Sequence, residues 1–391
     1  MQTIDQRLDE LFADMVGWRR HLHRNPELSF QEEKTAAFVA ERLREWGLEV
    51  QENVGGFGVV GRLEGRKSGR TVALRADMDA LPISDEKTCD YRSQVDGVMH
   101  ACGHDAHTAA LLGVAKAFSE RKNELDGNIV FLFQPAEEVA PGGALPMIRE
   151  GALEGVDVIY GVHLWTPFPV GEAYCAAGPI MAGVDDFTIE IVGKGGHGGL
   201  PHETVDSIVV GSHLVIHLQS IVSRNVDPTE PCVITVGTFQ GGGSFNVIAE
   251  RTVLKGTVRT FNEQIRERVR RRIERVVADT CAMFGATADL TFRRGYPTVV
   301  NDEREVRRFF EVAPSVFGEG NVRRCPPMMA AEDFAYYLQK VPGCFIFVGA
   351  GNKEKQIDSP HHHPRFDIDE SAMRHSSKLL AKMALDYISA R

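Results

Sequence analysis

The feature that most constrains the fold is a regular alternation of short apolar runs with amphipathic stretches. The runs Thr71–Arg75, Asn128–Phe133 and Asp157–Val162 have the length and composition of buried strands, and His107–Phe118, between the first two, has the periodicity of a helix. This alternation is typical of βαβ units, in which a largely parallel sheet has helices on both faces. We therefore expect an α/β fold.

Further elements of the same kind are predicted before and after these units. Helices are predicted at Ile4–Arg24, at about Gln31–Trp46, shortly after Asn301 and from Asp369 onward, and a strand is predicted at Cys344–Val348. Glu32 and Glu33 lie on the second of these helices without other metal-binding residue types beside them. We expect both of these side chains at the surface.

Around residue 185 the pattern changes. Alternating segments predict strands at Phe187–Val192, Cys232–Phe239, Val253–Phe261 and Ala288–Phe292, and helical periodicity predicts helices at Val205–Ser223 and Ile265–Phe284. Along the chain the order is strand, helix, strand, strand, helix and strand. This order is that of a split βαβ, ferredoxin-like sandwich, which can fold on its own. We predict a discontinuous α/β domain, residues 1–184 and 296–391, interrupted by an α+β domain at residues 185–295.

Composition excludes several classes of protein. The chain of 391 residues has a net charge of −10, and its one basic run, Arg266–Arg275, is interrupted by glutamates as on a solvated helix face, so we expect no nucleic-acid partner. The first residues are acidic, and no apolar stretch is long enough to span a membrane, so we expect neither a secretory signal nor a membrane partner. The seven cysteines form no CxxC pair, which favours free thiols in a cytoplasmic protein.

Acids and a histidine follow three of the predicted strands. Asp77 and Asp79 come after the first strand, Glu137 and Glu138 after the second, and His163 after the third. Because ligands gather at the carboxyl ends of parallel strands, we expect these loops to converge. A lone acid in such a place is commonly a helix cap or a turn residue, so the prediction of a shared site depends on their coincidence.

The segment His100–His107, just before a predicted helix, adds thiol and imidazole groups to these acids. Mixed sulfur, nitrogen and oxygen donors are what a transition metal requires. Cys102 could instead be a nucleophile with His104 or His107 as its base. We favour a metal site because it also explains the acids.

The adjacent pair Glu137-Glu138 has a chemical reading of its own. Neighbouring side chains on a loop diverge, so one carboxylate can bind a metal while the other faces water activated by it. That free carboxylate can then take a proton from the water and deliver it to a leaving amine.

Two other motifs are rejected as functional. Gly193–Gly198 satisfies the dinucleotide fingerprint, but further residues intervene before the next helix. His213 and His217 have the spacing of a zinc-binding helix, but no glutamate follows His213. We interpret these two histidines as packing or subunit-contact residues.

The motifs taken together resemble those of the metal-dependent N-acyl-amino-acid amidohydrolases, which include aminoacylases, hippurate hydrolases and hydrolases of auxin–amino acid conjugates. The resemblance covers nearly the whole chain. It is carried by Trp18–His23, Pro26–Phe30, Arg75–Pro82, Met99–His107, Phe133–Glu138, Gly195–His197, Asn246–Ile248, Gly256–Arg259 and His362–Phe366.

The resemblance implies two divalent metal ions per subunit (zinc, manganese, cobalt or nickel) in a metallopeptidase-like catalytic domain. Their ligands would be Cys102, His104, Glu138, His163 and His362, with the Cys102 thiolate shared between the ions. His362 is chosen among three consecutive histidines by its spacing to Pro364 and Phe366.

Other residues take supporting roles by the same resemblance. Glu137 would be the general base and acid, Asp79 would support the ligands, and His197 would act on the reacting carbonyl. Asn246 and Arg259 would hold the substrate carboxylate, a task that suits the planar arginine side chain. The inserted domain is implied to be a lid and to form a homodimer or a higher homo-oligomer.

Two departures from the family pattern bear on substrate size. Ala330 and Ala331 stand where the family has two small residues beginning with glycine, and Ala249 stands where proline is usual. The expected reaction is hydrolysis of a small-molecule N-acyl amino acid to a carboxylic acid and a free amino acid. The alternatives are a dipeptidase, an N-acetyl-diaminopimelate deacetylase, and a metal-dependent binding protein without turnover.

Overall fold

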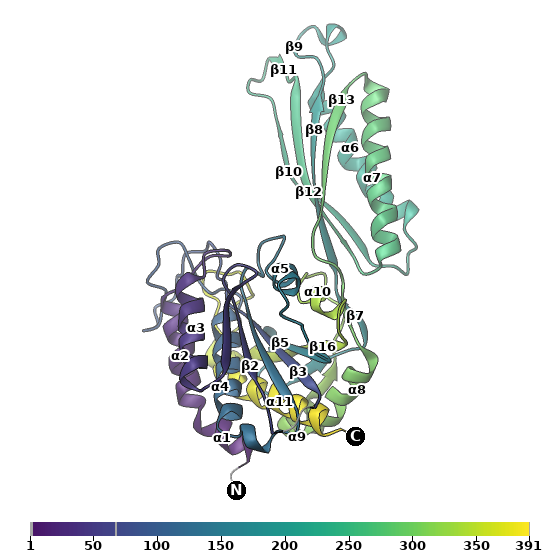
Figure 1. Ribbon diagram of the computed structural model, residues 1–391. Coiled ribbons are helices and arrows are strands. Elements are labelled where there is room, and N and C mark those ends of the chain that lie inside the picture. The colour runs from purple at the N-terminus through teal and green to yellow at the C-terminus, as the bar shows by residue number, and fades with distance from the viewer. Residues whose placement is uncertain (1–2, 67–68, 391) are drawn as a thin grey trace. The chain divides into compact units, whose positions relative to one another are not determined.

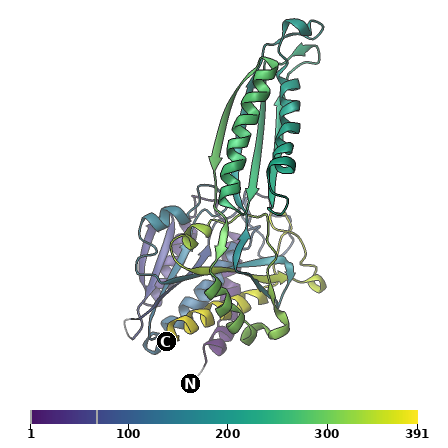
Figure 2. The same cartoon turned by 90° about the vertical axis from the view of Figure 1, so that its right-hand side faces the viewer.

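The computed structural model describes residues 3–66 and 69–390, so the predicted domain ends at residues 1, 2 and 391 lie outside the described residues. The chain forms two compact units (Figures 1 and 2). Unit 1 contains the residues up to Gly178, Val299–Pro326 and those from Asp333 onward, and unit 2 contains Pro179–Thr298 and Pro327–Glu332.

Unit 1 is built on a mixed sheet of eight strands in the order β1-β2-β4-β3-β5-β16-β6-β15. These are β1 (Glu49–Val54), β2 (Gly58–Leu63), β3 (Thr71–Asp77), β4 (Asn128–Gln134), β5 (Val158–Pro169), β6 (Ala173–Cys175), β15 (Val322–Arg324) and β16 (Gly343–Gly351). The central run β4-β3-β5-β16 is parallel throughout, whereas β1 and β2 are antiparallel. The predicted α/β fold is confirmed.

The helices of unit 1 are mostly amphipathic. They are α1 (Ile4–Glu10), α2 (Phe12–Arg24), α3 (Glu33–Glu45), α4 (His104–Ser119), α5 (Ala144–Arg149), α8 (Glu303–Val312), α9 (Pro314–Phe317), α10 (Ala335–Leu338) and α11 (Ser371–Ser389), with 3-10 turns at Lys122–Glu124, Glu319–Asn321 and Lys353–Lys355. The single helix predicted over Ile4–Arg24 is wrong, because the chain breaks at Leu11 into α1 and α2.

Alternation along the strands gives the sheet of unit 1 one apolar face and one face with polar groups. Val72 and Leu74 of β3 belong to the apolar core, which α4 and α11 cover. Arg75, the next residue of β3 after Leu74, is also buried, and its guanidinium donates to Gln134 Oε1 of β4 at 2.8 Å. Successive side chains of a strand point to opposite faces, so the polar groups collect on the second face.

The second face is packed closely at Gly161 of β5. A Cβ there would lie 2.8 Å from the ring of Phe334, which directly precedes α10. The rings of Phe334 and Phe345 are 5.0 Å apart, centroid to centroid. A side chain larger than glycine would push this aromatic layer away from the sheet.

Two boundaries in unit 1 differ from the prediction and move functional residues. Helix α4 begins at His104 rather than at residue 107, because Gly103, with φ +91°, turns the chain directly into the helix. His104 and His107 therefore lie on its first turns. Strand β5 runs on to Pro169, so His163 lies within the strand rather than after it.

Unit 2 has the predicted order of elements. Its antiparallel sheet β10-β12-β8-β13 is formed by β8 (Gly183–Val192), β10 (Cys232–Gly241), β12 (Arg251–Thr260) and β13 (Thr287–Arg294). Helices α6 (Ser207–Asn225) and α7 (Glu263–Phe284) pack against each other and the sheet (Figures 1 and 2). The short elements are β7 (Gly178–Met181), β9 (Gly196–His197), a 3-10 turn at Pro201–Glu203, β11 (Val247–Ile248) and, in unit 1, β14 (Val299–Asn301).

Helix α7 carries the basic run that was predicted to be a solvated face. It begins at the cap Asn262, whose side chain accepts from the N–H of Gln264 at 2.8 Å. Arg266 departs from the prediction, because it is buried and donates to both oxygens of Asp185. Arg266 lies on the inner face of the helix beside Ile265, and Asp185 compensates its charge.

Among the described residues, no helix combines the length and apolar character that crossing a membrane requires.

Candidate metal centre

The five predicted ligands come from separate segments of unit 1. Cys102 and His104 lie at the entry to α4, and Glu138 follows β4. His163 lies in β5, and His362 follows β16. The parallel order of β4, β3, β5 and β16 brings these segments to the same edge of the sheet.

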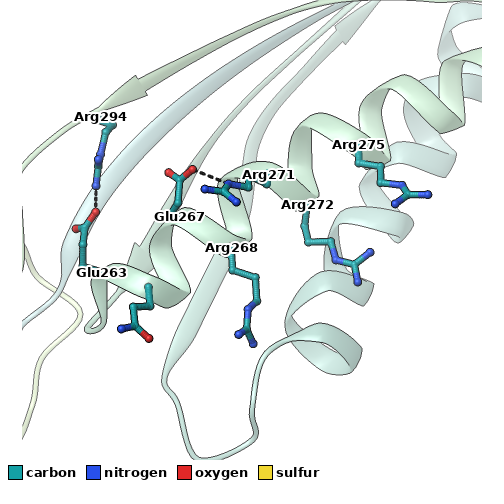
Figure 3. Close-up of a pocket in the computed structure, with 8 residues that line it drawn as sticks. Glu263, Glu267, Arg268, Arg271, Arg272, Arg275 and Arg294 are labelled. Atoms are coloured by element: carbon teal, nitrogen blue, oxygen red, sulfur yellow. Dashed lines mark hydrogen bonds and ion pairs between the residues drawn. The ribbon is translucent and has the colours of Figure 1, made fainter.

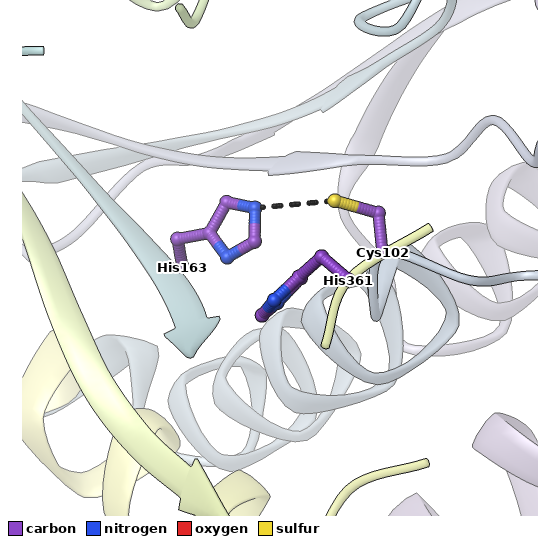
Figure 4. A group of neighbouring side chains, drawn as sticks. All are labelled: Cys102, His163 and His361. Carbon is purple, nitrogen blue, oxygen red and sulfur yellow. Dashed lines mark hydrogen bonds between the residues drawn. The ribbon is translucent and has the colours of Figure 1, made fainter. Parts of the chain in front are cut away.

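At this edge the structure brings all five side chains together. Cys102 Sγ lies 3.5 Å from His163 Nε2, and His362 Nε2 lies 3.4 Å from Glu138 Oε1. The donor atoms of Cys102, His104 and Glu138 lie within 4.8 Å of one another. Figure 4 shows His163 facing Cys102, with His361 beside them.

Hydrogen bonds orient two of the imidazoles so that one nitrogen of each is available. His163 Nδ1 lies 2.9 Å from the carbonyl of Leu164, to which it donates, and this leaves Nε2 directed at Cys102. His104 Nδ1 lies 2.9 Å from the carbonyl of Asp79 and 3.2 Å from its carboxylate. A histidine whose second nitrogen donates to a carbonyl or carboxylate is the usual arrangement of a metal ligand.

Two donor atoms of this cluster are buried and have no hydrogen-bond partner among the residues that the structure describes. They are His104 Nε2 and Glu138 Oε1, which lie 3.8 Å apart. Buried polar atoms without partners are costly and rare, so each calls for an explanation. A cation bound between them would satisfy both, so the residues present fit a metal ion.

The charges of the cluster also favour a cation. Although burial alone would lower it, the carboxylates of Asp77 and Asp79 raise the pKa of His104 to about 10. Burial, together with the charges of Glu138 and Glu137, raises the pKa of the Cys102 thiol well above its usual value. A bound metal ion would reverse this by stabilising the thiolate and displacing the proton from His104.

Asp79 supports two of the candidate ligands at once. Its carboxylate accepts from the N–H of Glu138 at 3.0 Å and from the Ser29 hydroxyl at 2.7 Å, in addition to its contacts with His104. It is fully buried. These contacts are those expected of a residue that orients ligands rather than binding the ion.

The motifs did not reveal a role for Asp77 and His107, which form a second buried pair beside the cluster. His107 Nδ1 donates to Asp77 Oδ1 at 2.6 Å, and His107 Nε2 accepts from the N–H of Leu164 at 2.9 Å. Arg75 donates to the same carboxylate. Because both nitrogens of His107 are engaged, it is not available as a base for Cys102. The His-x-x-His spacing places His107 about one helical turn after His104, and this was the sequence signal that His107 lies near the cluster.

His361 also lies at the cluster, although the sequence singled out its neighbour. One of its nitrogens lies within 4.8 Å of the donor atoms of Cys102 and His163 (Figure 4). Its Nε2 lies 3.0 Å from the Leu164 carbonyl, and its ring stacks on Trp165 with centroids 4.2 Å apart. The run of three histidines was the available signal.

Glu137 lies near the cluster but outside it. It is buried, and its charge is felt by the Cys102 thiol. It does not belong to the donor groups found around Cys102 in the described part of the chain; instead, one of its oxygens lies within 4.8 Å of oxygens of Glu332 and Asp333. Glu137 is therefore part of an acidic group beside the ligand cluster.

The predicted substrate-binding residues of unit 2 do not form a single group. His197 of β9 pairs with Val247 of β11, next to Asn246. Arg259 lies near the far end of β12, opposite Val184 and Val233. β12 has 10 residues, so at roughly 3.3 Å per residue its ends are about 30 Å apart.

Unit 2 also has a basic hollow of about 800 Å³ along α7. It is lined by Glu263, Gln264, Glu267, Arg268, Arg271, Arg272, Arg275 and Arg294 (Figure 3). Glu267 accepts from Arg271 at 2.8 Å, and Glu263 pairs with Arg294. Apart from the buried Arg266, the basic run of α7 therefore resembles the predicted solvated face, and some of its arginines form ion pairs with glutamates at the surface.

Comparisons with known proteins place this arrangement in a family. The model of peptidase family M20/M25/M40 matches residues 73–386. The chain belongs to this family. It is thus a hydrolase of the M20 family, the group to which the motifs pointed.

Its relatives support the same assignment. The Bacillus subtilis protein YhaA, named as an amidohydrolase, is 50% identical over 99% of this chain and 98% of its own length. An N-acyl-L-amino acid amidohydrolase of Geobacillus stearothermophilus is 49% identical over 78% of this chain and 83% of its own. The structure of the Bacillus subtilis protein YXEP, a dinuclear metal-binding peptidase of the M20 family, superposes with a TM-score of 0.84 at 34% identity, over 98% of this chain and 99% of the other.

Proposed function

We propose that this chain hydrolyses the amide bond of N-acyl amino acids and releases a carboxylic acid and a free amino acid. The observation that carries the proposal is the convergence of Cys102, His104, Glu138, His163 and His362, in which two buried donor atoms have no hydrogen-bond partner among the described residues, with Glu137 beside this cluster. The N-acyl-L-amino acid amidohydrolase among the relatives supports the substrate class.

The five clustered side chains would hold two divalent ions, with the Cys102 thiolate between them. Thiolate, imidazole and carboxylate donors suit zinc, manganese, cobalt or nickel. The dinuclear structural relative supports the number of ions. When bound, such ions acidify water and polarise a carbonyl.

Glu137 would carry the proton. It accepts one from the attacking water as the new C–O bond forms and returns it to the nitrogen as the C–N bond breaks. The products are then a carboxylic acid and a neutral amine, which become a carboxylate and a protonated amine when the acid's proton passes to the amine, and water is the only co-substrate. Burial of Glu137 limits competition from bulk water.

Unit 2 would supply substrate contacts. His197 would donate to the oxyanion of the reacting carbonyl, and Asn246 and Arg259 would each contact the substrate carboxylate. Because Asn246 and Arg259 lie towards opposite ends of β12, they are alternative rather than joint partners of that carboxylate within one chain. We also propose that unit 2 acts as a lid and as the surface of a homodimer.

Glu137→Gln tests the proton-transfer role. The amide keeps the shape of the side chain but cannot accept the proton, so kcat should fall about 10²- to 10⁴-fold while the metal content stays at the wild-type value. The exposed Glu354→Gln is the matched control and should retain full activity. Wild-type turnover by Glu137→Gln would remove Glu137 from this role.

A panel of N-acetyl amino acids, N-benzoyl amino acids, N-acetyl-diaminopimelate and dipeptides tests the substrate class. We expect hydrolysis of N-acyl amino acids by the metal-loaded protein. Preference for dipeptides or for N-acetyl-diaminopimelate would establish one of the alternative activities on the same scaffold. No cleavage of any member by fully metal-loaded protein would favour a binding protein.

A further inference from the structure

Glu32 is buried although its neighbour Glu33 is exposed. Glu32 directly precedes α3, and its side chain is 0% exposed. The prediction that both residues lie at the surface is therefore wrong for Glu32. A carboxylate is seldom taken out of water unless its oxygens have specific partners.

One oxygen of Glu32 accepts from two backbone N–H groups of residues in unusual conformations, whereas Oε2 is buried without a hydrogen-bond partner among the described residues. Glu32 Oε1 accepts from the N–H of Ala136 at 2.7 Å and from that of Phe30 at 3.0 Å. Ala136 has φ +52° and Phe30 has φ +64°. Both lie in the left-handed region that residues with a Cβ avoid, and such residues persist only where their surroundings hold them.

Ala136 immediately precedes the two functional carboxylates. Its conformation therefore sets the direction in which Glu137 and Glu138 leave strand β4. The N–H of Glu138 is fixed by Asp79 Oδ2, and that same oxygen accepts from the Ser29 hydroxyl. The short segment from Ser29 to Glu32 therefore holds the loop after β4 in two ways, through Asp79 at Glu138 and through the hydrogen bond to Ala136.

We propose that Glu32 is a positioning residue that holds Ala136 in the left-handed conformation and so directs the carboxylates of Glu137 and Glu138 towards the cluster. The inference rests on the proposed function for its effect on turnover, but not for its effect on the loop. Glu32 itself touches neither the ligands nor the substrate. It acts through one backbone hydrogen bond.

The test compares Glu32→Ala, Glu32→Gln and the matched control Glu33→Ala in the metal-loaded protein. The amide oxygen of glutamine can still accept from Ala136 and Phe30, whereas alanine cannot. The rate of hydrogen exchange of the backbone amides between Gln134 and Glu138 measures directly how firmly Glu32 holds this loop. Exchange should speed up in Glu32→Ala and stay near the wild-type rate in Glu32→Gln and Glu33→Ala.

Turnover provides the second readout. In Glu32→Ala, kcat should fall about 10- to 100-fold, as for a small displacement of catalytic groups, with KM close to that of the wild type. Glu32→Gln should recover most of the loss. Adding Ala136→Gly to Glu32→Ala should also recover part of it, because glycine adopts a positive φ without strain.

Equal exchange and equal kcat in Glu32→Ala and Glu33→Ala would overturn the proposal. So would a loss in Glu32→Ala that Glu32→Gln does not recover, since that would assign the effect to charge. If Glu32→Ala does not fold, Glu32→Asp, whose carboxylate is one methylene shorter, takes its place. Should the wild type cleave none of the amides tested, the proposed function fails, while the exchange measurement still decides the role of Glu32.

Discussion

Asp79 illustrates how one side chain can control several others. Its carboxylate contacts His104 and the N–H of Glu138, so removing it frees two of the candidate ligands. Asp79→Ala should weaken metal affinity about 10- to 100-fold, which competition with a chromophoric chelator measures. The exposed Asp96→Ala is the control. Unchanged affinity in Asp79→Ala would show that the ligands hold their geometry without it.

Glu32 gives a pH-dependent prediction for the metal-free protein. Burial and the nearby charge of Asp79 raise the pKa of Glu32 from 4.5 to about 7, so the folded state holds this proton more tightly than the unfolded state. As pH rises from 4.5 to 7, the free energy of unfolding should therefore fall for the wild type relative to Glu32→Gln, by about 3 kcal/mol at most.

Denaturant unfolding of the chelated proteins across this pH range measures the effect. Glu33→Gln should follow the wild-type curve, because its side chain is exposed. A constant difference between wild type and Glu32→Gln at all pH values would contradict the raised pKa.

At the residue scale the sequence was informative about chemistry and poor about burial. The positions of Cys102, Glu138 and His163 beside predicted strands and a helix indicated a metal site, and the family resemblance named the ligands. The burial of Glu32 could not be predicted, because it depends on the loop after β4, which is about a hundred residues away in the chain. The same holds for Arg266 of α7, whose partner Asp185 lies on β8, about eighty residues earlier in the chain.

At the scale of elements, the pair Arg266–Asp185 ties α7 to β8. Both side chains are buried, and Arg266 also donates to the carbonyls of Val184 and Gly295. Asp185→Asn would leave the buried guanidinium with only the exposed Glu263 as a counter-charge. It should lower the free energy of unfolding of unit 2 by about 3–5 kcal/mol.

The control for this prediction lies on the same strand. Glu190 forms an exposed ion pair with Arg251, so Glu190→Gln should cost less than about 1 kcal/mol. Denaturant unfolding followed by hydrogen exchange of α7 and β8 measures both variants. Equal effects of the two substitutions would show that the buried pair is not a principal tie in unit 2.

Elements with apolar runs were predictable, and those defined by tertiary contacts were not. β3, β4 and β16 are fully buried or nearly so, so apolar residues dominate their sequences and the strands stand out. β1 alternates exposed and half-buried residues, and its pairing with β2 gave no comparable signal. The break at Leu11 was hidden because the apolar periodicity continues through it. The separation of Asn246 from Arg259 depends on strand length and register, which motifs do not report.

At the scale of the whole molecule, metal binding should stabilise one part of the chain. The cluster lies entirely in unit 1, so ions that bind only the folded state stabilise that unit. At about a hundred- to a thousandfold excess over Kd the gain is roughly 3–4 kcal/mol. Calorimetry should show a unit 1 transition that moves down on chelation and a unit 2 transition that does not.

His362→Ala provides the control for this effect. The His362 side chain belongs to the cluster and contacts Glu138. His363→Ala is the matched variant, because it removes the neighbouring histidine, which lies outside the cluster. The metal-dependent shift should shrink in the first variant and persist in the second. A shift of the unit 2 transition, or none at all in the wild type, would contradict a metal site in unit 1.

The central claim is that residues far apart in the chain bind catalytic metal ions at the edge of the unit 1 sheet. Metal content per chain, measured by mass spectrometry alongside hydrolysis of an N-acetyl amino acid before and after chelation, tests it most directly. The account predicts two ions per chain, loss of hydrolysis on their removal and recovery when they are restored. Full hydrolysis by metal-free protein, or unchanged metal content after Cys102→Ala, would contradict it.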